Sequence, residues 1–171
     1  MRRLPLFLFC ALLVACQPPA ADPGPVQEAG EGGTVLVTED DPEMTTAIEQ
    51  ARATLDEAIA AVPNRDEGHL DVLVKAGFAT PDDGTEHMWL VVEGYDDGVF
   101  HTWVGNVPVY TEVIAYDDEV DVAAEEISDW MIVEDGVMRG GYTTRLIVSR
   151  MTDEERAAFD AEAPFTFSDE P

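Results

Sequence analysis

Both cysteines of this 171-residue chain lie close to its N-terminus, and their positions predict a fold without an internal disulfide. Cys10 lies inside an apolar run, residues 4–14, which a signal peptidase is expected to remove together with Arg2 and Arg3. Cys16 closes a Leu-Val-Ala-Cys motif of the lipobox type, at which cleavage would leave this cysteine as the first residue of the mature chain. The hydrophobic core alone must therefore stabilise the fold. About 130 residues follow this region and its linker, which is enough for one domain.

The same segment predicts where the protein resides. Its apolar run is shorter than the about 20 residues that a membrane-spanning helix needs, and Ala15 is a small residue of the kind accepted at a cleavage point. The pattern resembles that of secreted lipoproteins, which implies a palmitate-bearing Cys16 and a membrane anchor. Because Gln17 and not Asp follows the cysteine, the resemblance implies sorting to the outer membrane, facing the periplasm.

The charge balance is strongly acidic, with 36 Asp and Glu against 9 Lys and Arg and a formal net charge of −27. Nucleic-acid binding depends on cationic side chains, so this function class is excluded, as is attraction to anionic lipid head groups. The acids occur in pairs such as Asp82-Asp83, but no Asp-x-Asp-x-Asp-Gly calcium loop is present. We interpret them as a solvated shell, with divalent-cation binding as the alternative.

Composition divides the chain into four segments. Residues 1–15 are the predicted signal peptide, and residues 16–33, rich in Pro, Ala, Gly and Glu, are a predicted disordered tether. A flexible chain of that length reaches roughly 20–25 Å. Residues 34–163 are the predicted folded domain, beginning with a candidate strand at 34–38, and residues 164–171 are a predicted frayed tail.

The clearest predicted element is a helix over residues 42–62. Asp41-Pro42-Glu43 provides an N-cap carboxylate, a proline at the first helical position and an acid that the helix dipole favours. Apolar residues then recur every three or four positions, at Met44, Ile48, Ala51, Leu55, Ile59 and Val62. Pro63-Asn64 ends the pattern.

Strand-like segments occupy the middle of the chain, at residues 70–78, 86–93 and 99–105, with a hairpin turn at 95–98. If Val91 opposes Trp103, one face of the hairpin carries Trp89, Val91, His101 and Trp103, and the other carries Met88, Leu90, Phe100 and Val104. Apolar groups on both faces predict a sheet that is covered on both sides.

The remaining segments complete the predicted fold. Residues 107–122 predict one or two strands and residues 130–133 another, whereas residues 142–148 fit a strand or a helix after a tight turn at Gly140-Gly141. Thr152 and Glu155 form a capping-box pattern, which predicts a short helix to about Ala161. The predicted fold class is α+β: a single domain with a twisted antiparallel sheet, one long amphipathic helix packed on a face and a short C-terminal helix.

Six motifs between about Asp41 and Met151 resemble, in order and spacing, those of the YegJ-like bacterial domain of unknown function. They are Asp41-Pro42-Glu43-Met44, Val74-Lys75, Glu86-His87-Met88-Trp89, Gly105-Asn106-Val107-Pro108, Ile127-Ser128-Asp129-Trp130-Met131 and Gly140-Gly141-Tyr142-Thr143-Thr144-Arg145. The chain departs from the family at Tyr116-Asp117-Asp118, where the family tends to have Gly-Asp before a strand. The resemblance implies a small exported protein and supplies no activity.

Charged residues inside apolar stretches are the candidate site. Lys75, the only lysine, and Arg145 are cations in such surroundings, and Glu86 and Asp129 are acids. If their segments converge, they form a pocket for a small polar ligand, with candidate binding residues Lys75, Glu86, His87, Trp89, Asn106, Asp129, Trp130 and Arg145. The alternative, which we favour, is that partly buried ion pairs fix the strand order while the tryptophans fill the core.

Motifs for metal binding or nucleophilic catalysis are lacking. His69, His87 and His101 have no zinc-ligand spacing, so no metal or other cofactor is expected. No serine lies in a Gly-x-Ser-x-Gly motif, and Gly140-Gly141 lacks the further residues of a phosphate loop. No catalytic residue is assigned.

These observations predict a non-enzymatic binding or envelope-accessory module held at a membrane by its lipid. Two alternatives remain. A hydrolase would gather carboxylates with displaced pKa values in one cleft. An immunity-like protein would capture a basic toxin, since strong negative charge attracts a basic protein partner quickly.

Overall fold

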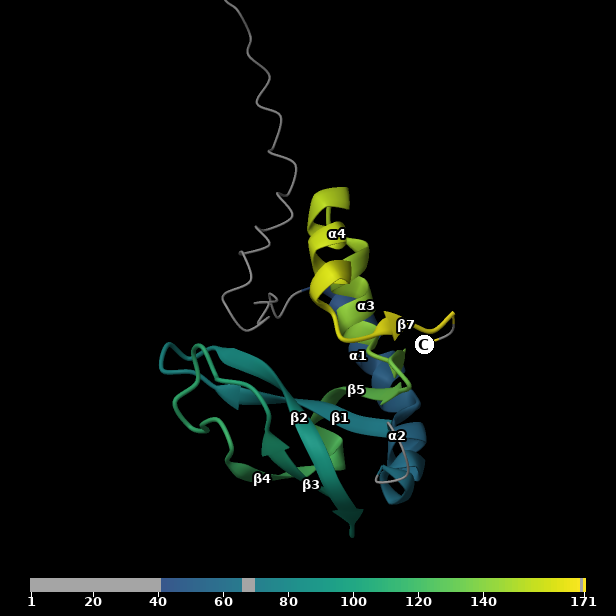
Figure 1. Ribbon diagram of the computed structural model, residues 1–171. Coiled ribbons are helices and arrows are strands. Elements are labelled where there is room, and N and C mark those ends of the chain that lie inside the picture. Colours follow the sequence, from purple (N-terminus) through teal and green to yellow (C-terminus); the bar gives the residue numbers. More distant parts are fainter. Residues whose placement is uncertain (1–40, 66–69, 170) are drawn as a thin grey trace, which may run out of the picture.

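A twisted sheet with helices on one side organises the part of the chain that the computed structural model describes, residues 41–65, 70–169 and 171 (Figure 1). Within those residues the strand order is β4-β3-β2-β1-β5-β6-β7, and neighbours pair antiparallel except β6 and β7. The strands are β1 (Leu70–Ala79), β2 (Thr85–Asp96), β3 (Val99–Val104), β4 (Glu119–Ala123), β5 (Ile127–Glu134), β6 (Val137–Gly140) and β7 (Thr166–Phe167). The helices are α1 (Pro42–Ala53), α2 (Leu55–Ala61), α3 (Tyr142–Ser149) and α4 (Asp153–Glu162), with short 3-10 turns η1 (Val62–Asn64) and η2 (Ala124–Glu126). The predicted α+β fold is confirmed.

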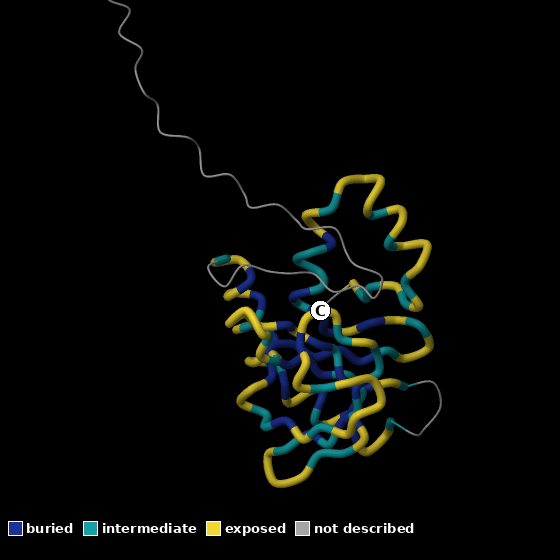
Figure 2. Tube along the Cα trace, turned by 90° about the vertical axis from the view of Figure 1, so that its left-hand side faces the viewer, coloured by how far each residue is buried: buried dark blue, intermediate teal, exposed yellow. Residues whose placement is uncertain are grey.

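The register of the β2–β3 hairpin, which the sequence left open, is the one that places Val91 opposite Trp103. The face that packs toward α1 and α2 carries buried Met88, Leu90, Phe100 and Val104. The opposite face carries Trp89, Val91, His101 and Trp103, which are only half-buried. The expectation that the sheet is covered on both sides is therefore wrong for this hairpin. Figure 2 shows the buried residues gathered at the centre of the domain.

The predicted single helix over 42–62 is divided into α1 and α2 at Thr54, whose φ of −116° and ψ of 10° leave the helical region. The cause is a tertiary contact. The indole N–H of Trp130 donates to the Ala51 carbonyl at 3.0 Å, and in an uninterrupted helix that carbonyl would accept the N–H of Leu55. The Thr54 hydroxyl lies 3.2 Å from the same indole nitrogen. The apolar stripe still faces the core, with Ala51, Leu55 and Ala58 buried.

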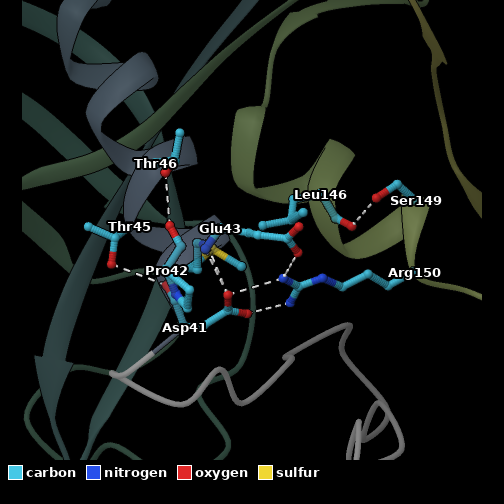
Figure 3. Close-up of polar contacts among 9 residues, drawn as sticks. Asp41, Pro42, Glu43, Thr45, Thr46, Leu146, Ser149 and Arg150 are labelled. Atoms are coloured by element: carbon cyan, nitrogen blue, oxygen red, sulfur yellow. Dashed lines mark hydrogen bonds and ion pairs between the residues drawn. The ribbon is translucent and has the colours of Figure 1, made fainter. Parts of the chain in front are cut away.

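The start of α1 is tied to the end of α3 by Arg150 (Figure 3). Asp41 is the predicted N-cap, and its carboxylate accepts the backbone N–H of Glu43 at 3.0 Å and of Met44 at 3.2 Å. The Arg150 guanidinium donates to the carboxylates of both Asp41 and Glu43. These contacts with Arg150 are the main reason that the pKa of Asp41 is lowered to about 2. Arg150 therefore holds the N-terminal end of α1 against the end of α3.

Within the segment predicted to be a frayed tail, residues 164–171, two residues pair in the sheet. Thr166–Phe167 forms β7 beside β6, and the ring of Phe167 stacks on Phe159 of α4 with centroids 6.1 Å apart. The capping box of Thr152 and Glu155 begins α4 as predicted. The segment 142–148, for which the sequence left strand or helix open, is helical and forms α3. The carboxylate of Asp129 on β5 caps the N–H groups at the start of this helix.

Residues 107–122 contribute one strand, β4, in agreement with the predicted one or two. Only β4 is regular there, and residues 105–118 make an irregular connection from β3 to β4. Asp117 has a φ of +72°, which lies in the left-handed region that favours glycine. Aspartate is one of the residues that tolerate this conformation.

Several predictions concern residues outside those described: the signal peptide 1–15, Cys16, the tether 16–33, the strand at 34–38 and His69. Among the described residues, no helix has the length and apolar character required to cross a membrane.

Two glycines with similar backbones provide a test of packing near Trp130. Gly98 has a φ of +85° and open space where a Cβ would lie, whereas Gly140, with a φ of +73°, would place a Cβ 2.5 Å from the Trp130 carbonyl oxygen. We expect Gly98→Ala to lower the free energy of unfolding by about 1–2 kcal/mol through backbone strain alone. Gly140→Ala should cost about 1–3 kcal/mol more, because the clash adds to the same strain. Urea denaturation of both variants measures the difference, and equal losses would contradict the proposed close packing.

Candidate functional site

Three of the predicted site residues, Lys75, Trp89 and Asp129, are neighbours in the sheet. Lys75 on β1 pairs with Asp129 on β5, and both side chains are buried. Thr143, in the first turn of α3, joins them: Lys75 Nζ donates to Thr143 Oγ1 at 2.8 Å, and Thr143 Oγ1 donates to Asp129 Oδ2 at 2.5 Å. On the other side of β1, Trp89 pairs with Lys75, and its ring centroid lies 4.6 Å from Nζ. We call Lys75, Trp89, Asp129 and Thr143 the Lys75 cluster.

Asp129 also supplies the missing cap of α3. The N-cap residue of this helix is Gly141, at a φ of +66°, where a Cβ would lie 2.4 Å from a Met138 side-chain atom. Glycine offers no capping side chain, and the Asp129 carboxylate instead accepts the backbone N–H of Tyr142 at 3.1 Å and of Thr143 at 2.8 Å. A residue distant in sequence thus satisfies the N–H groups that a helix start leaves unpaired.

Burial dominates the electrostatics of this pair. Burial lowers the pKa of Lys75, and the attraction of Asp129 opposes that shift. Burial likewise raises the pKa of Asp129, against the attraction of Lys75 and the hydrogen bonds from Thr143 and Trp130. The Thr143 hydroxyl bridges the two charged groups, so the Lys75 cluster has the properties of a buried charge pair with a structural role.

His87 and Ser128 lie beside the Lys75 cluster. The Nδ1 atom of exposed His87 is 3.1 Å from the Oγ of buried Ser128, and that hydroxyl donates to the Lys75 carbonyl at 3.2 Å. A nucleophilic serine would direct its proton to the imidazole instead. The geometry therefore favours a positioning contact over a catalytic dyad.

The other predicted site residues lie elsewhere. Trp130 faces the helices. Arg145 donates to the carbonyls of Gly140, Met138 and Ser168 and so holds β6 near the C-terminal residues. The amide of Asn106 points to the Met88 sulfur at 4.0 Å. The side chain of Glu86 lies on the core face of β2, opposite to the face that carries Lys75. The eight predicted site residues therefore do not gather in one pocket.

Glu86 organises a second candidate site, the connection of residues 105–118 between β3 and β4, which we call the display loop. Glu86 is only 1% exposed, and its carboxylate accepts three consecutive backbone N–H groups, from Val109 at 3.0 Å, Tyr110 at 2.8 Å and Thr111 at 2.7 Å. The Thr111 hydroxyl donates to the Ala79 carbonyl of β1 at 2.7 Å. One buried side chain thus fixes the middle of the display loop.

The end of the display loop is fixed as well. The N–H of Val104 donates to the Asp118 carbonyl at 2.9 Å, and the N–H of Asp117 donates back to the Val104 carbonyl at 3.0 Å. The Asp118 carboxylate accepts the N–H of Ala115 at 2.8 Å. Ile114 packs against the core. These contacts give the display loop a defined shape without regular secondary structure.

Large apolar side chains on the display loop face solvent. Of the six exposed large hydrophobic residues among those described, five lie here: Val107, Val109, Tyr110, Val113 and Tyr116. Val107 is 67% exposed and Val113 is 64% exposed. Sequence reasoning missed this surface because the apolar residues of 107–122 were assigned to strands. The signal available was Glu86 itself, an acid at a core-facing position of a strand.

Two cavities lie away from both sites. One of about 450 Å³ is lined by Ile59, Val62, Pro63, Arg65, Glu93 and Tyr95, and one of about 200 Å³ adjoins it at Arg65 and Glu93. Neither lining includes Lys75 or Asp129. Within the described part of the chain, no group of three or more His, Cys, Asp or Glu residues is arranged to hold a metal ion.

Comparisons with known proteins agree with the motif pattern. The family model described as "Uncharacterized protein conserved in bacteria (DUF2314)" matches residues 41–167. The Uncharacterized protein YegJ of Escherichia coli (strain K12) is 30% identical over 112 residues, which cover 66% of this chain and 71% of YegJ. The Putative ankyrin repeat protein NMB1133/NMB1171 of Neisseria meningitidis serogroup B is 35% identical over 95 residues, which cover 54% of this chain but only 37% of that protein. No solved structure matches the chain. The YegJ-like resemblance predicted from the sequence is confirmed.

Variants of the Lys75 cluster test its structural role. Asp129→Ala leaves a buried cation and an uncapped α3, so the free energy of unfolding should fall by about 3–5 kcal/mol in urea denaturation. Lys75→Met combined with Asp129→Leu leaves no buried charge in the Lys75 cluster, so this double variant should be more stable than Asp129→Ala alone. A double variant that is the less stable of the two would contradict the ion-pair interpretation.

Proposed function

Because the chain belongs to the bacterial family described as uncharacterized protein conserved in bacteria (DUF2314), whose description names no activity, we propose a function from its structure. The protein is a lipid-anchored, non-enzymatic docking module of the cell envelope, and its contact surface is the display loop. The observation that carries this proposal is the use of buried Glu86 to hold a loop whose large apolar side chains face outward.

The cost of this arrangement supports a role in recognition. A buried carboxylate loses its hydration, and hydrogen bonds must compensate for that loss. Five large apolar side chains on one loop give up the stabilisation that burial would provide, and exposed apolar patches of this kind mark interaction sites. Tyrosine is enriched at such interfaces because it combines apolar area with a hydroxyl group. A preformed loop also loses little conformational entropy on binding.

The carboxylates favour docking over hydrolysis. A general acid or base must be within hydrogen-bond reach of its substrate. Asp129 accepts hydrogen bonds from Trp130, Tyr142 and Thr143, and Glu86 accepts three from the display loop. Each of these buried acids is committed to positioning backbone.

Lipid attachment at Cys16 would keep this docking surface at the membrane. The lipobox supports acylation, and the predicted tether of residues 16–33 would give the domain roughly 20–25 Å of reach. The formal charge of −27 would hold the domain away from anionic head groups.

Labelling with radioactive palmitate tests the anchor. Wild-type protein should carry the label and remain in the envelope fraction, and Cys16→Ala should lose both properties. Cys10→Ala is the matched control: its labelling should equal that of the wild type, since Cys10 leaves with the signal peptide. Unlabelled wild-type protein would overturn the proposal of a lipid anchor.

Site-specific crosslinking in cells tests the docking surface. A photoreactive phenylalanine analogue at Val113 should give discrete protein adducts, whereas the same analogue at exposed Glu154 on α4 should give few. Tyr110→Ser and Glu86→Gln should each lower the adduct yield at Val113 severalfold, the first by removing a contact and the second by loosening the loop. Hydrogen exchange of the β1 and β2 amides checks that the Glu86→Gln sheet remains folded. No adducts at Val113, or equal yields at both positions, would overturn the docking proposal.

A further inference from the structure

We infer that the display loop receives a basic protein surface, with an apolar centre and lysine or arginine residues around it. This inference rests on the proposed docking function and adds the chemistry of the partner. It follows from the charges that surround the exposed apolar residues.

Acidic side chains flank the display loop on both sides. The turn between β1 and β2 carries exposed Asp82 and Asp83, and the hydrogen bond from Thr111 to Ala79 places this turn beside the loop (Figure 1). At its other end the loop runs through Asp117 and Asp118 into Glu119 of β4. We call the exposed acids here the acidic rim: Asp82, Asp83, Glu112, Asp117, Asp118 and Glu119.

Cations are remote from the acidic rim. Residues 76–138, which include β2, β3, the display loop, β4 and β5, contain no lysine or arginine. The arginine ion pairs within the described residues join Arg139 to Glu57, Arg150 to Asp41 and Glu43, and Arg156 to Asp160. All of them lie on α1, α2, α3, α4 or β6. The negative charge of the rim is therefore not neutralised from within the described structure.

Charge complementarity indicates which kind of partner would bind the display loop. A second copy would bring the same rim and the same charge of −27 against this surface, and an anionic bilayer would be repelled in the same way. A partner with lysine or arginine around an apolar centre would be attracted by the rim and would cover the exposed valines and tyrosines. An apolar centre with a charged rim is the usual anatomy of a protein–protein interface. Attraction of this kind accelerates association and weakens with salt.

A peptide library displayed on phage provides the probe. Random peptides are selected on the full chain purified from the envelope, and the enriched peptides should combine lysine or arginine with aromatic or branched apolar residues. Tyr110→Ser combined with Val113→Ser should weaken their binding at least about tenfold. The rim variant Asp83→Asn/Glu112→Gln/Glu119→Gln should slow association at least about tenfold at low salt. The control variant Glu49→Gln/Asp56→Asn/Glu162→Gln removes as many exposed charges from α1, α2 and α4 and should stay within about twofold of the wild type.

The outcomes separate this inference from the docking function. Neutral or acidic peptides that still require Tyr110 and Val113 would overturn the basic partner and leave the docking surface intact. Basic peptides that bind equally well without Tyr110 and Val113 would show attraction by charge alone and overturn the inference. Association of the chain with itself through the loop, or binding to phosphatidylglycerol vesicles that Tyr110→Ser abolishes, would overturn it in favour of a second copy or a membrane.

Discussion

The carboxylate of Asp129 is the contact on which the arrangement of this domain depends. It lies at the point where β5 meets β1, and it accepts hydrogen bonds from the backbone of Trp130 and from the first turn of α3. Through Thr143 it also balances the buried charge of Lys75. Removal of one partner would leave a charge in an apolar interior, where it is costly. This mutual requirement fixes the start of α3 relative to the sheet.

Glu86 makes the same kind of contact as Asp129, but with a loop. Like Asp129 it is a buried carboxylate that accepts several backbone N–H groups, but those groups belong to an irregular loop and not to a helix. A helix satisfies most of its own hydrogen bonds, whereas the display loop relies on a side chain from the neighbouring sheet. The result is a rigid loop that presents apolar residues to solvent. The two acids lie on opposite faces of the sheet: Glu86 lies on the core face, where it holds the display loop, and Asp129 lies on the face that carries Lys75.

The ion pairs of the domain are distributed unevenly between its helical side and the side formed by the display loop and β4. Arg139, Arg150 and Arg156 pair with acids of the helical side, where they tie α1 to α3 and β6 to α2. The side formed by the display loop and β4 keeps its carboxylates without an arginine or lysine partner among the described residues. Electrostatic stabilisation of the fold is therefore concentrated away from the surface that we propose for docking. The strong acidity remains available for attraction of a partner.

The elements with local causes follow from the sequence: the N-cap at Asp41, the hairpin turn at residues 95–98, the capping box of α4 and the α+β class. Such features depend on residues within a few positions of one another or on a simple alternation. The break at Thr54, the helical state of α3, the separation of Glu86 from Lys75 and the pairing of β7 depend on the tertiary structure. At Thr54 and at the start of α3, a group distant in sequence completes or replaces a backbone hydrogen bond, as Trp130 does at Ala51 and Asp129 at Thr143. Local patterns carry no information about such partners, because the partners meet only when the sheet has formed.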